Sequence, residues 1–157
     1  MEGLGRVAAG MGREGPEPVR ELVRRTLWLM NDESGGLLWN GPQVLGAVLA
    51  HVPVLRAELA SVLASFLEEE PFRVGTRWAL WRLALVAPET VREIGADLAA
   101  SLADPDPAVR GHAALALRAA GNAVPDLERD RAAFLLFDPR TGELRETSVA
   151  RAAAGEP

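Results

Sequence analysis

The sequence lacks cysteine, lysine and tyrosine altogether, and each absence removes a kind of chemistry. Without cysteine the chain has no disulfide, no thiolate metal site and no thiol nucleophile. Without lysine it has no amine for a Schiff base or for general-base catalysis, and all seventeen basic residues are arginine. We interpret this bias, together with the single isoleucine Ile94, as a result of genome base composition rather than of function.

The chain has a negative net charge and no long apolar run. Its formal net charge of −5 disfavours binding to nucleic acid, because phosphate contacts need a clustered basic face. No run of eighteen apolar residues indicates a membrane span, and the first residues lack the charged start and apolar core of a signal peptide. We therefore expect a cytoplasmic protein with no membrane partner. A nucleic acid partner is disfavoured, although a local basic groove stays open.

Glycine, proline and apolar residues are distributed as in a helical domain with a flexible start. Residues 1–16 are rich in glycine and poor in apolar side chains, so we expect a flexible or loosely attached segment. From residue 17 onward, apolar residues recur every three or four positions and prolines divide the pattern. The pattern predicts a single domain over 17–154, with helices over 17–30, 42–52, 55–67, 72–86, 89–102 and 107–120.

The end of the chain changes from helical to strand-like sequence. Residues 133–137 and 143–147 resemble short strands, and the segment between them contains proline and glycine. We predict a β-hairpin over about 132–147, followed by a short helix through Ala154 that Ser148 caps. Because an isolated hairpin is marginally stable, we expect it to pack on the helices or on a partner, including a second copy of the chain.

The clearest motif spans residues 104–117 and marks the start of a helix. Asp106 is the expected N-cap, and Pro107 follows at the first helical position, where the missing N–H costs nothing. The apolar residues that follow form one stripe, with Leu115 off it. Gly121 is the expected C-terminal cap.

This motif resembles a known repeat. The pattern Asp-Pro-Asp-Pro-x-Val-Arg-x-x-Ala-x-x-Ala-Leu resembles the HEAT-like repeat of phycobilisome-lyase-related proteins. The resemblance covers about one repeat, since residues 17–103 share only helices of suitable length. It implies a mostly α fold, a short α-solenoid of antiparallel helix pairs, here with a C-terminal β-hairpin.

The best candidate for a functional site is the polar loop over residues 31–41. It contains Asn31, Asp32, Glu33 and Ser34, followed by Trp39. Loops of this kind bind cations, an arginine side chain or a small polar ligand. In the alternative interpretation, Asn31 and Asp32 cap the preceding helix and the glycines make the turn. Both interpretations are open at this point.

The predicted helix over 72–86 supplies further candidates. Helical spacing places Arg77 and Trp81 on one line, and Trp78 and Arg82 on another. Arginines beside indoles form stacking grooves for anionic or aromatic ligands. More often, tryptophan belongs to the core and arginine extends over it toward a carboxylate, which we favour for Trp78 and leave open for Trp81. A salt bridge from Arg77 or Arg82 to the carboxylates of the 31–41 loop is a third hypothesis.

The loop, Trp78 and Arg82 carry a second resemblance. Together they resemble a group of small uncharacterised bacterial HEAT-like proteins with an Asn-Asp-Glu-Ser-Gly-Gly segment. This resemblance extends over most of residues 19–152, including the hairpin. It implies no known activity, but it suggests that the loop and the helix over 72–86 belong to one surface.

The remaining polar residues show no catalytic pattern. His51 and His112 fall on separate predicted helices without an adjacent glutamate, which disfavours a zinc or iron site, and we expect His112 to be partly exposed. The serines lack a Gly-x-Ser-x-Gly elbow, and no glycine-rich phosphate loop is present. We therefore predict no cofactor, no metal and no catalytic residue.

Two functional hypotheses follow from these observations. The first is a non-enzymatic interaction or scaffold module that binds another protein, because stacked helix pairs present an extended surface and the hairpin adds a docking edge. The alternative is a helical-repeat enzyme or ligand-binding protein, lyase-like or glycosylase-like, with its site at the 31–41 loop and the helix over 72–86. The acidic charge disfavours the glycosylase form of this alternative.

Overall fold

The structure, a computed structural model, describes residues 1–13, 15–31, 38–125 and 127–156, and it is mostly helical. These residues form nine α-helices, two short 3₁₀ turns and one two-stranded antiparallel sheet. The chain divides into two compact units, Met1–Ala79 and Leu80–Pro157. The single domain expected over 17–154 stays a prediction.

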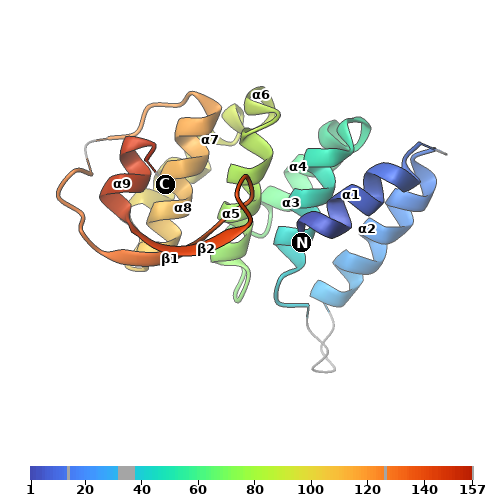
Figure 1. The fold of residues 1–157 in the computed structure, drawn as a ribbon, viewed down its shortest axis with the longest axis horizontal. Helices are drawn as coiled ribbons and strands as arrows, with labels where there is room; N and C mark the ends of the chain where they lie inside the picture. Colours follow the sequence, from blue (N-terminus) through green and yellow to red (C-terminus); the bar gives the residue numbers. More distant parts are fainter. Residues whose placement is uncertain (14, 32–37, 126, 157) are drawn as a thin grey trace. The chain divides into compact units, whose positions relative to one another are not determined.

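The first unit is organised around α3 (Gly41–His51), which lies beside α1 (Glu2–Met11) in Figure 1. α3 is apolar along nearly its whole length. α1, α2 (Glu17–Met30) and α4 (Arg56–Ala64) pack against α3, and the 3₁₀ turn η1 (Pro53–Leu55) leads into α4. Because α3 contacts three helices, all but one of its residues from Gly41 to Ala50 are buried. α3 is therefore the core of this unit.

The same helix bears on the question of a membrane span. Among the described helices, none is long and apolar enough to cross a membrane by itself. α3 and the segment Pro53–Ala64 reach that length and composition only when taken together, and the chain bends by 116° between them.

The N-terminal segment differs from the expectation. Residues 2–11 form α1, which buries Gly5 and Ala8 and packs against α3. The carboxylate of Glu2 lies 3.2 Å from Nε2 of His51 on α3. Glycine lowers intrinsic helix propensity, but most helix stability in proteins comes from packing. The prediction of a flexible segment over 1–16 is therefore wrong for the part that forms α1.

Two helices match their predicted bounds because local signals mark their ends. α2 spans 17–30, and α8 (Pro107–Ala120) begins and ends where the motif indicates. The Asp106 carboxylate accepts a hydrogen bond from the Ala108 N–H at 2.8 Å. Gly121 terminates α8 in the left-handed conformation, with φ of 77°.

The helix predicted over 89–102 is broken. The structure has α6 (Pro88–Arg92) and α7 (Gly95–Ala100) in its place, and the break falls just before Gly95. The side chain of Asn122 packs directly on this backbone, since a Cβ at Gly95 would lie 2.3 Å from Nδ2 of Asn122. The contact comes from the loop after α8, so helical periodicity could not indicate it. The prediction of one continuous helix is wrong.

The second unit is built around α8, which is buried on nearly every side. α6, α7, the 3₁₀ turn η2 (Ser101–Ala103) and α9 (Val149–Ala154) pack on it, and so does the hairpin. Leu115, off the predicted stripe, is buried all the same. His112 is only 3% exposed, so the expectation of partial exposure is wrong.

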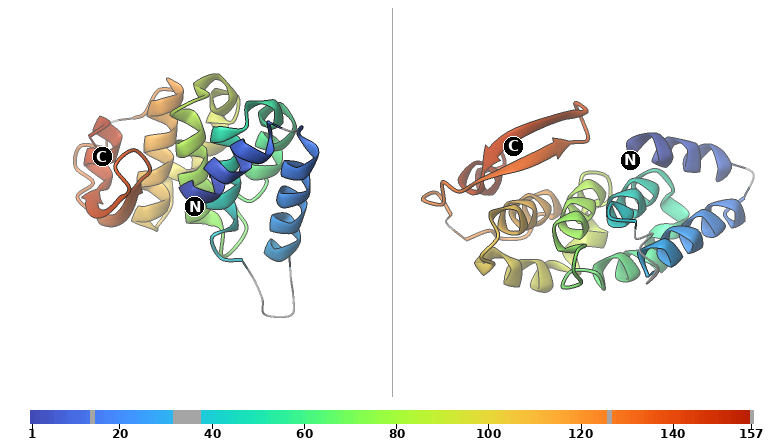
Figure 2. Two further views of the ribbon diagram at one scale, coloured as in Figure 1. Left: turned by 45° about the vertical axis from the view of Figure 1, so that its right-hand side comes forward. Right: turned by 90° about the horizontal axis from the view of Figure 1, so that it is seen from below.

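The predicted hairpin is confirmed. β1 (Ala133–Asp138) pairs antiparallel with β2 (Glu143–Ser148), with Ala133 opposite Ser148 and Asp138 opposite Glu143. The right-hand view of Figure 2 shows the hairpin as a layer on one side of α8. The Ser148 side chain caps α9, as predicted, by accepting from the Arg151 N–H.

A tight aromatic contact joins the hairpin to α8. The Phe134 ring lies edge-on to the His112 ring, with centroids 5.0 Å apart. It also fills the space over Gly111, where a Cβ would lie 2.2 Å from Cε1 of Phe134. His112 Nδ1 lies 2.7 Å from the Ala108 carbonyl oxygen, and burial lowers the pKa of His112 to about 4. The imidazole is therefore neutral at pH 7.

The hairpin turn is closed by a buried carboxylate. Asp138 is 1% exposed and accepts hydrogen bonds from Nε of Arg140 at 3.0 Å and from one of its terminal nitrogens at 2.7 Å. These bonds hold the pKa of Asp138 below its usual range. The Arg140 guanidinium lies 5.9 Å from the ring centroid of Trp81, which ties the turn to the helix of that tryptophan.

The buried histidine makes stability dependent on pH. The pKa of His112 is about 4 in the folded protein and the ordinary 6.5 in the unfolded chain, so acid protonates His112 in the unfolded chain first. The folded state keeps its full stability with respect to this group above about pH 6.5. As the pH falls toward 4, the free energy of unfolding decreases by about 3 kcal/mol. Urea unfolding of the wild type from pH 7 to pH 4 should show this loss, and His112→Gln should not. The control His51→Gln should keep it; equal pH dependence in all three proteins contradicts the assignment.

The space over Gly111 gives a second stability prediction. Gly111→Ala forces Phe134 to move and should lower the free energy of unfolding by about 1–3 kcal/mol. Gly10→Ala in α1, where a Cβ meets nothing within 4 Å, should instead raise it by about 0.5–1 kcal/mol. Urea unfolding measures both variants. A neutral Gly111→Ala would mean that Phe134 does not pack there.

Candidate functional site

The polar loop predicted as a site lies only partly within the described residues. Residues 32–37 lie outside them, and these include the candidates Asp32, Glu33 and Ser34. Asn31 ends α2, and its Nδ2 donates to the Leu27 carbonyl at 2.8 Å, which confirms the capping interpretation for this residue. Trp39 is 69% exposed at the other end of the loop.

The candidates on α5 (Arg73–Ala84) are all buried. The four are 0%, 4%, 2% and 8% exposed in the order Arg77, Trp78, Trp81, Arg82. The core interpretation favoured for Trp78 is confirmed, and it holds for Trp81 as well. The expectation that these side chains form part of an exposed interaction surface is wrong, because every residue from 75 to 84 is buried.

Arg77 holds the loop that precedes α5 in the first unit. Its guanidinium donates to the backbone carbonyls of Leu67 and Arg73, and it donates to the Glu68 carboxylate at 2.7 Å. One helical position earlier, the Thr76 hydroxyl donates to the Phe66 carbonyl at 3.2 Å. α5 thereby holds the backbone of the loop over 65–72 through side-chain hydrogen bonds.

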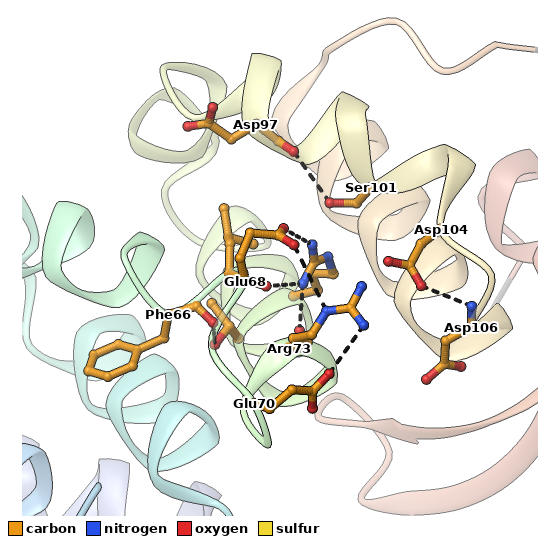
Figure 3. A network of polar contacts seen from close by, with 11 residues as sticks. Phe66, Glu68, Glu70, Arg73, Asp97, Ser101, Asp104 and Asp106 are labelled. Atoms are coloured by element: carbon orange, nitrogen blue, oxygen red, sulfur yellow. Dashed lines mark hydrogen bonds and ion pairs between the residues drawn. The ribbon is translucent and has the colours of Figure 1, made fainter. Parts of the chain in front are cut away.

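Two of the three consecutive glutamates in this loop are used to pair with arginines. Figure 3 shows Glu68 and Glu70 approaching Arg73 from two sides, at 3.9 Å and 3.2 Å. Glu68 also pairs with Arg77, so its charge is shared between two guanidinium groups. Glu69, which lies between them in the sequence, is exposed and makes no ion pair within the described residues.

The loop forms one wall of a cleft that lies wholly in the first unit. Its volume is about 410 Å³, and its lining includes Met30 and Asn31 at the end of α2. Phe66 and Phe72 supply aromatic surface, with their rings edge-on and centroids 5.7 Å apart. The remaining lining residues are polar or acidic: Ser65, Glu69 and Glu70. The cleft is thus apolar and aromatic in part, with carboxylates at its margin.

Sequence reasoning found only one residue of this cleft, Asn31. Phe66 falls in the apolar stripe of the helix predicted over 55–67, but α4 already ends at Ala64. The phenylalanine therefore lies in the loop after the helix. The three glutamates before Pro71 fall between the helices predicted over 55–67 and 72–86, where helical periodicity assigns no role. Two aromatics flanking an acidic loop were the available signal.

The cleft lining combines aromatic, polar and acidic groups. Within the described residues, no group of three or more histidine, aspartate and glutamate side chains is placed to hold a metal ion. The cleft contains carboxylates, an amide, a hydroxyl and two phenyl rings, and this set can recognise a cation with an apolar stem.

Comparisons with protein-family models, with curated proteins and with solved structures find no match to this chain.

Removing the Arg77 guanidinium should unfold the cleft wall. Arg77→Met leaves the Leu67 and Arg73 carbonyls without their donor and should lower the free energy of unfolding by about 2–4 kcal/mol. The matched control Arg25→Met removes an exposed arginine and should change it by less than about 0.5 kcal/mol. Urea unfolding compares the two; equal effects would mean that Arg77 does not hold the loop.

Proposed function

We propose that this chain is a non-enzymatic protein-interaction module whose cleft binds an arginine-bearing segment of another protein. The observation that carries the proposal is the composition of the cleft. Half-buried Phe66, whose ring meets the buried ring of Phe72 edge-on, lines it together with Glu69, which has no ion-pair partner among the described residues. The volume of about 410 Å³ is sufficient for one long side chain and its backbone.

An arginine side chain matches this chemistry better than other side chains do. Its aliphatic stem packs on apolar surface while its guanidinium stays at the water-exposed margin. The flat guanidinium also stacks on aromatic rings and forms two parallel hydrogen bonds with a carboxylate. The acidic net charge of the chain favours approach of a basic partner.

We also propose that the helices form a short HEAT-like solenoid, in keeping with the resemblance of residues 104–117. The Asp106 cap and the Gly121 terminus support it, as does the packing of consecutive helices α2 with α3, and α3 with α4. Such repeats commonly present binding surfaces for proteins.

The enzymatic alternative has less support in the structure. It requires Trp78 and Arg82 to line a groove together with the 31–41 loop, but both side chains are buried. In the cleft described above, the Ser65 hydroxyl donates to the Val62 carbonyl rather than to a carboxylate. No observation therefore favours the lyase-like or glycosylase-like hypothesis over binding.

A pair of matched peptides tests the function. The probes are the capped hexapeptide Ala-Ala-Leu-Arg-Ala-Ala and its counterpart with citrulline, which keeps the shape of arginine without its charge. In titrations followed by amide NMR, the arginine peptide should shift the signals of Phe66, Glu69 and Phe72. It should bind about threefold to fivefold more tightly than the citrulline peptide, as expected for one exposed ion pair.

Two variants test whether the preference for the arginine peptide arises at Glu69. Glu69→Gln should remove the preference for arginine over citrulline, and Glu93→Gln, which neutralises an exposed glutamate in the second unit, should leave it intact. If the arginine peptide binds elsewhere, or binds with equal strength after Glu69→Gln, the proposed function is wrong.

A further inference from the structure

The outer face of the hairpin carries two exposed leucines, Leu135 and Leu144, and the half-buried Phe137. The register places Phe137 opposite Leu144 on this face, and Leu135 lies two residues before Phe137 on the same side. Leu135 and Leu144 are 62% and 65% exposed. The opposite face is used by the fold, since Phe134, Leu136 and Asp138 are buried. The exposed apolar face is therefore a candidate docking surface.

The outer edge of β2 offers backbone hydrogen bonds beside this face. The Val149 N–H donates to the Ala132 carbonyl just beyond the strands. Hydrogen-bonded pairs alternate in antiparallel ladders, so the pairs are expected at Phe134–Thr147, Leu136–Arg145 and Asp138–Glu143. The amides and carbonyls of Leu144 and Glu146 therefore point away from β1. Within the described residues the sheet has only these two strands, so no third strand pairs with that edge.

The charged residues of β2 decide in which register β2 can pair with β2 of a second copy. In an antiparallel pairing of two copies about a two-fold axis, one residue lies opposite its own equivalent. Centring the axis on Arg145 or on Glu146 places like charges directly opposite each other, which is unfavourable. Centring it on Leu144 places leucine against leucine, and it places each Glu143 opposite Arg145 of the other copy.

We propose that this chain self-associates by pairing β2 with β2 of a second copy, antiparallel and centred on Leu144. The register then forms two intermolecular Glu143–Arg145 ion pairs on one face of a four-stranded sheet. On the other face it forms a row of four apolar side chains, Phe137 and Leu144 from each copy, because Phe137 lies opposite Leu144 within the hairpin. This inference does not depend on the proposed cleft.

The pairing also relieves an unfavourable feature of the single chain. Asp138 and Glu143 lie opposite each other in the hairpin, and this places two carboxylates together. Arg140 and Arg145 already contact Asp138, whereas the Glu143 side chain has no ion-pair partner among the described residues. Arg145 of the second copy supplies one. The contact involves a few residues per chain, so the association is weak and depends on concentration.

Sedimentation of the full chain measures this association. The weight-average mass should rise from 16.8 kDa toward twice that value as the concentration increases from about 10 µM to about 1 mM. Glu143→Arg should stay monomeric, because it opposes Arg145 of the second copy. The same substitution faces Asp138 within the chain, so the melting temperature should be unchanged or higher, which separates lost association from lost folding.

Three further proteins make the test specific. Leu144→Lys should abolish association, and the control Leu135→Lys, equally exposed but on the other strand, should not. Arg145→Glu alone should be monomeric, with Arg140 retaining its contacts to Asp138. An equimolar mixture of Glu143→Arg and Arg145→Glu should form a heterodimer, because each Arg then meets a Glu.

Three results would overturn the inference. The first is a wild-type mass that stays at 16.8 kDa throughout the concentration range. The second is an association that Leu135→Lys abolishes, which would place the contact on β1. The third is a mixture of the two charge variants that remains monomeric.

Discussion

The cleft of the first unit depends on one fully buried guanidinium. Because Arg77 is shielded from water, its donors must find fixed acceptors within the protein. Its two terminal nitrogens find them in the carbonyls of Leu67 and Arg73 and in the Glu68 carboxylate. These contacts hold the loop that carries Phe66 and Glu69. The geometry of the candidate site is therefore set by a residue that does not line it.

The second unit depends on neutral and paired groups in a similar way. The neutral imidazole of His112 lies under Phe134, and the Asp138 carboxylate is paired with Arg140 at the turn. Both contacts use the inner face of the hairpin. On the outer face Leu135 and Leu144 stay exposed, and in the part of the chain that the structure describes no third strand pairs with β2. In each unit, buried polar contacts set the surface on which we base a proposal.

Local signals predicted the elements, whereas tertiary contacts determined the site. The bounds of α8 and the hairpin followed from Asp106, Gly121 and the strand-like segments around the turn. The break before Gly95 was not predicted, and the Asn122 side chain that packs on Gly95 comes from a distant loop, which helical periodicity cannot indicate. For the same reason, the sequence placed Arg77 on a surface: its acceptors lie in a loop whose conformation no helical period describes. Of the cleft, only Asn31 was identified.

In the proposed function, the loop that Arg77 holds presents Phe66 and Glu69 to an arginine side chain. The most direct measurement is an intermolecular nuclear Overhauser spectrum of the isotope-labelled protein with the unlabelled arginine hexapeptide. If arginine binds in the cleft, we expect cross-peaks from the arginine side-chain methylene protons to the ring protons of Phe66. Cross-peaks confined to other parts of the chain, or no cross-peaks at concentrations that saturate the amide shifts, would contradict it.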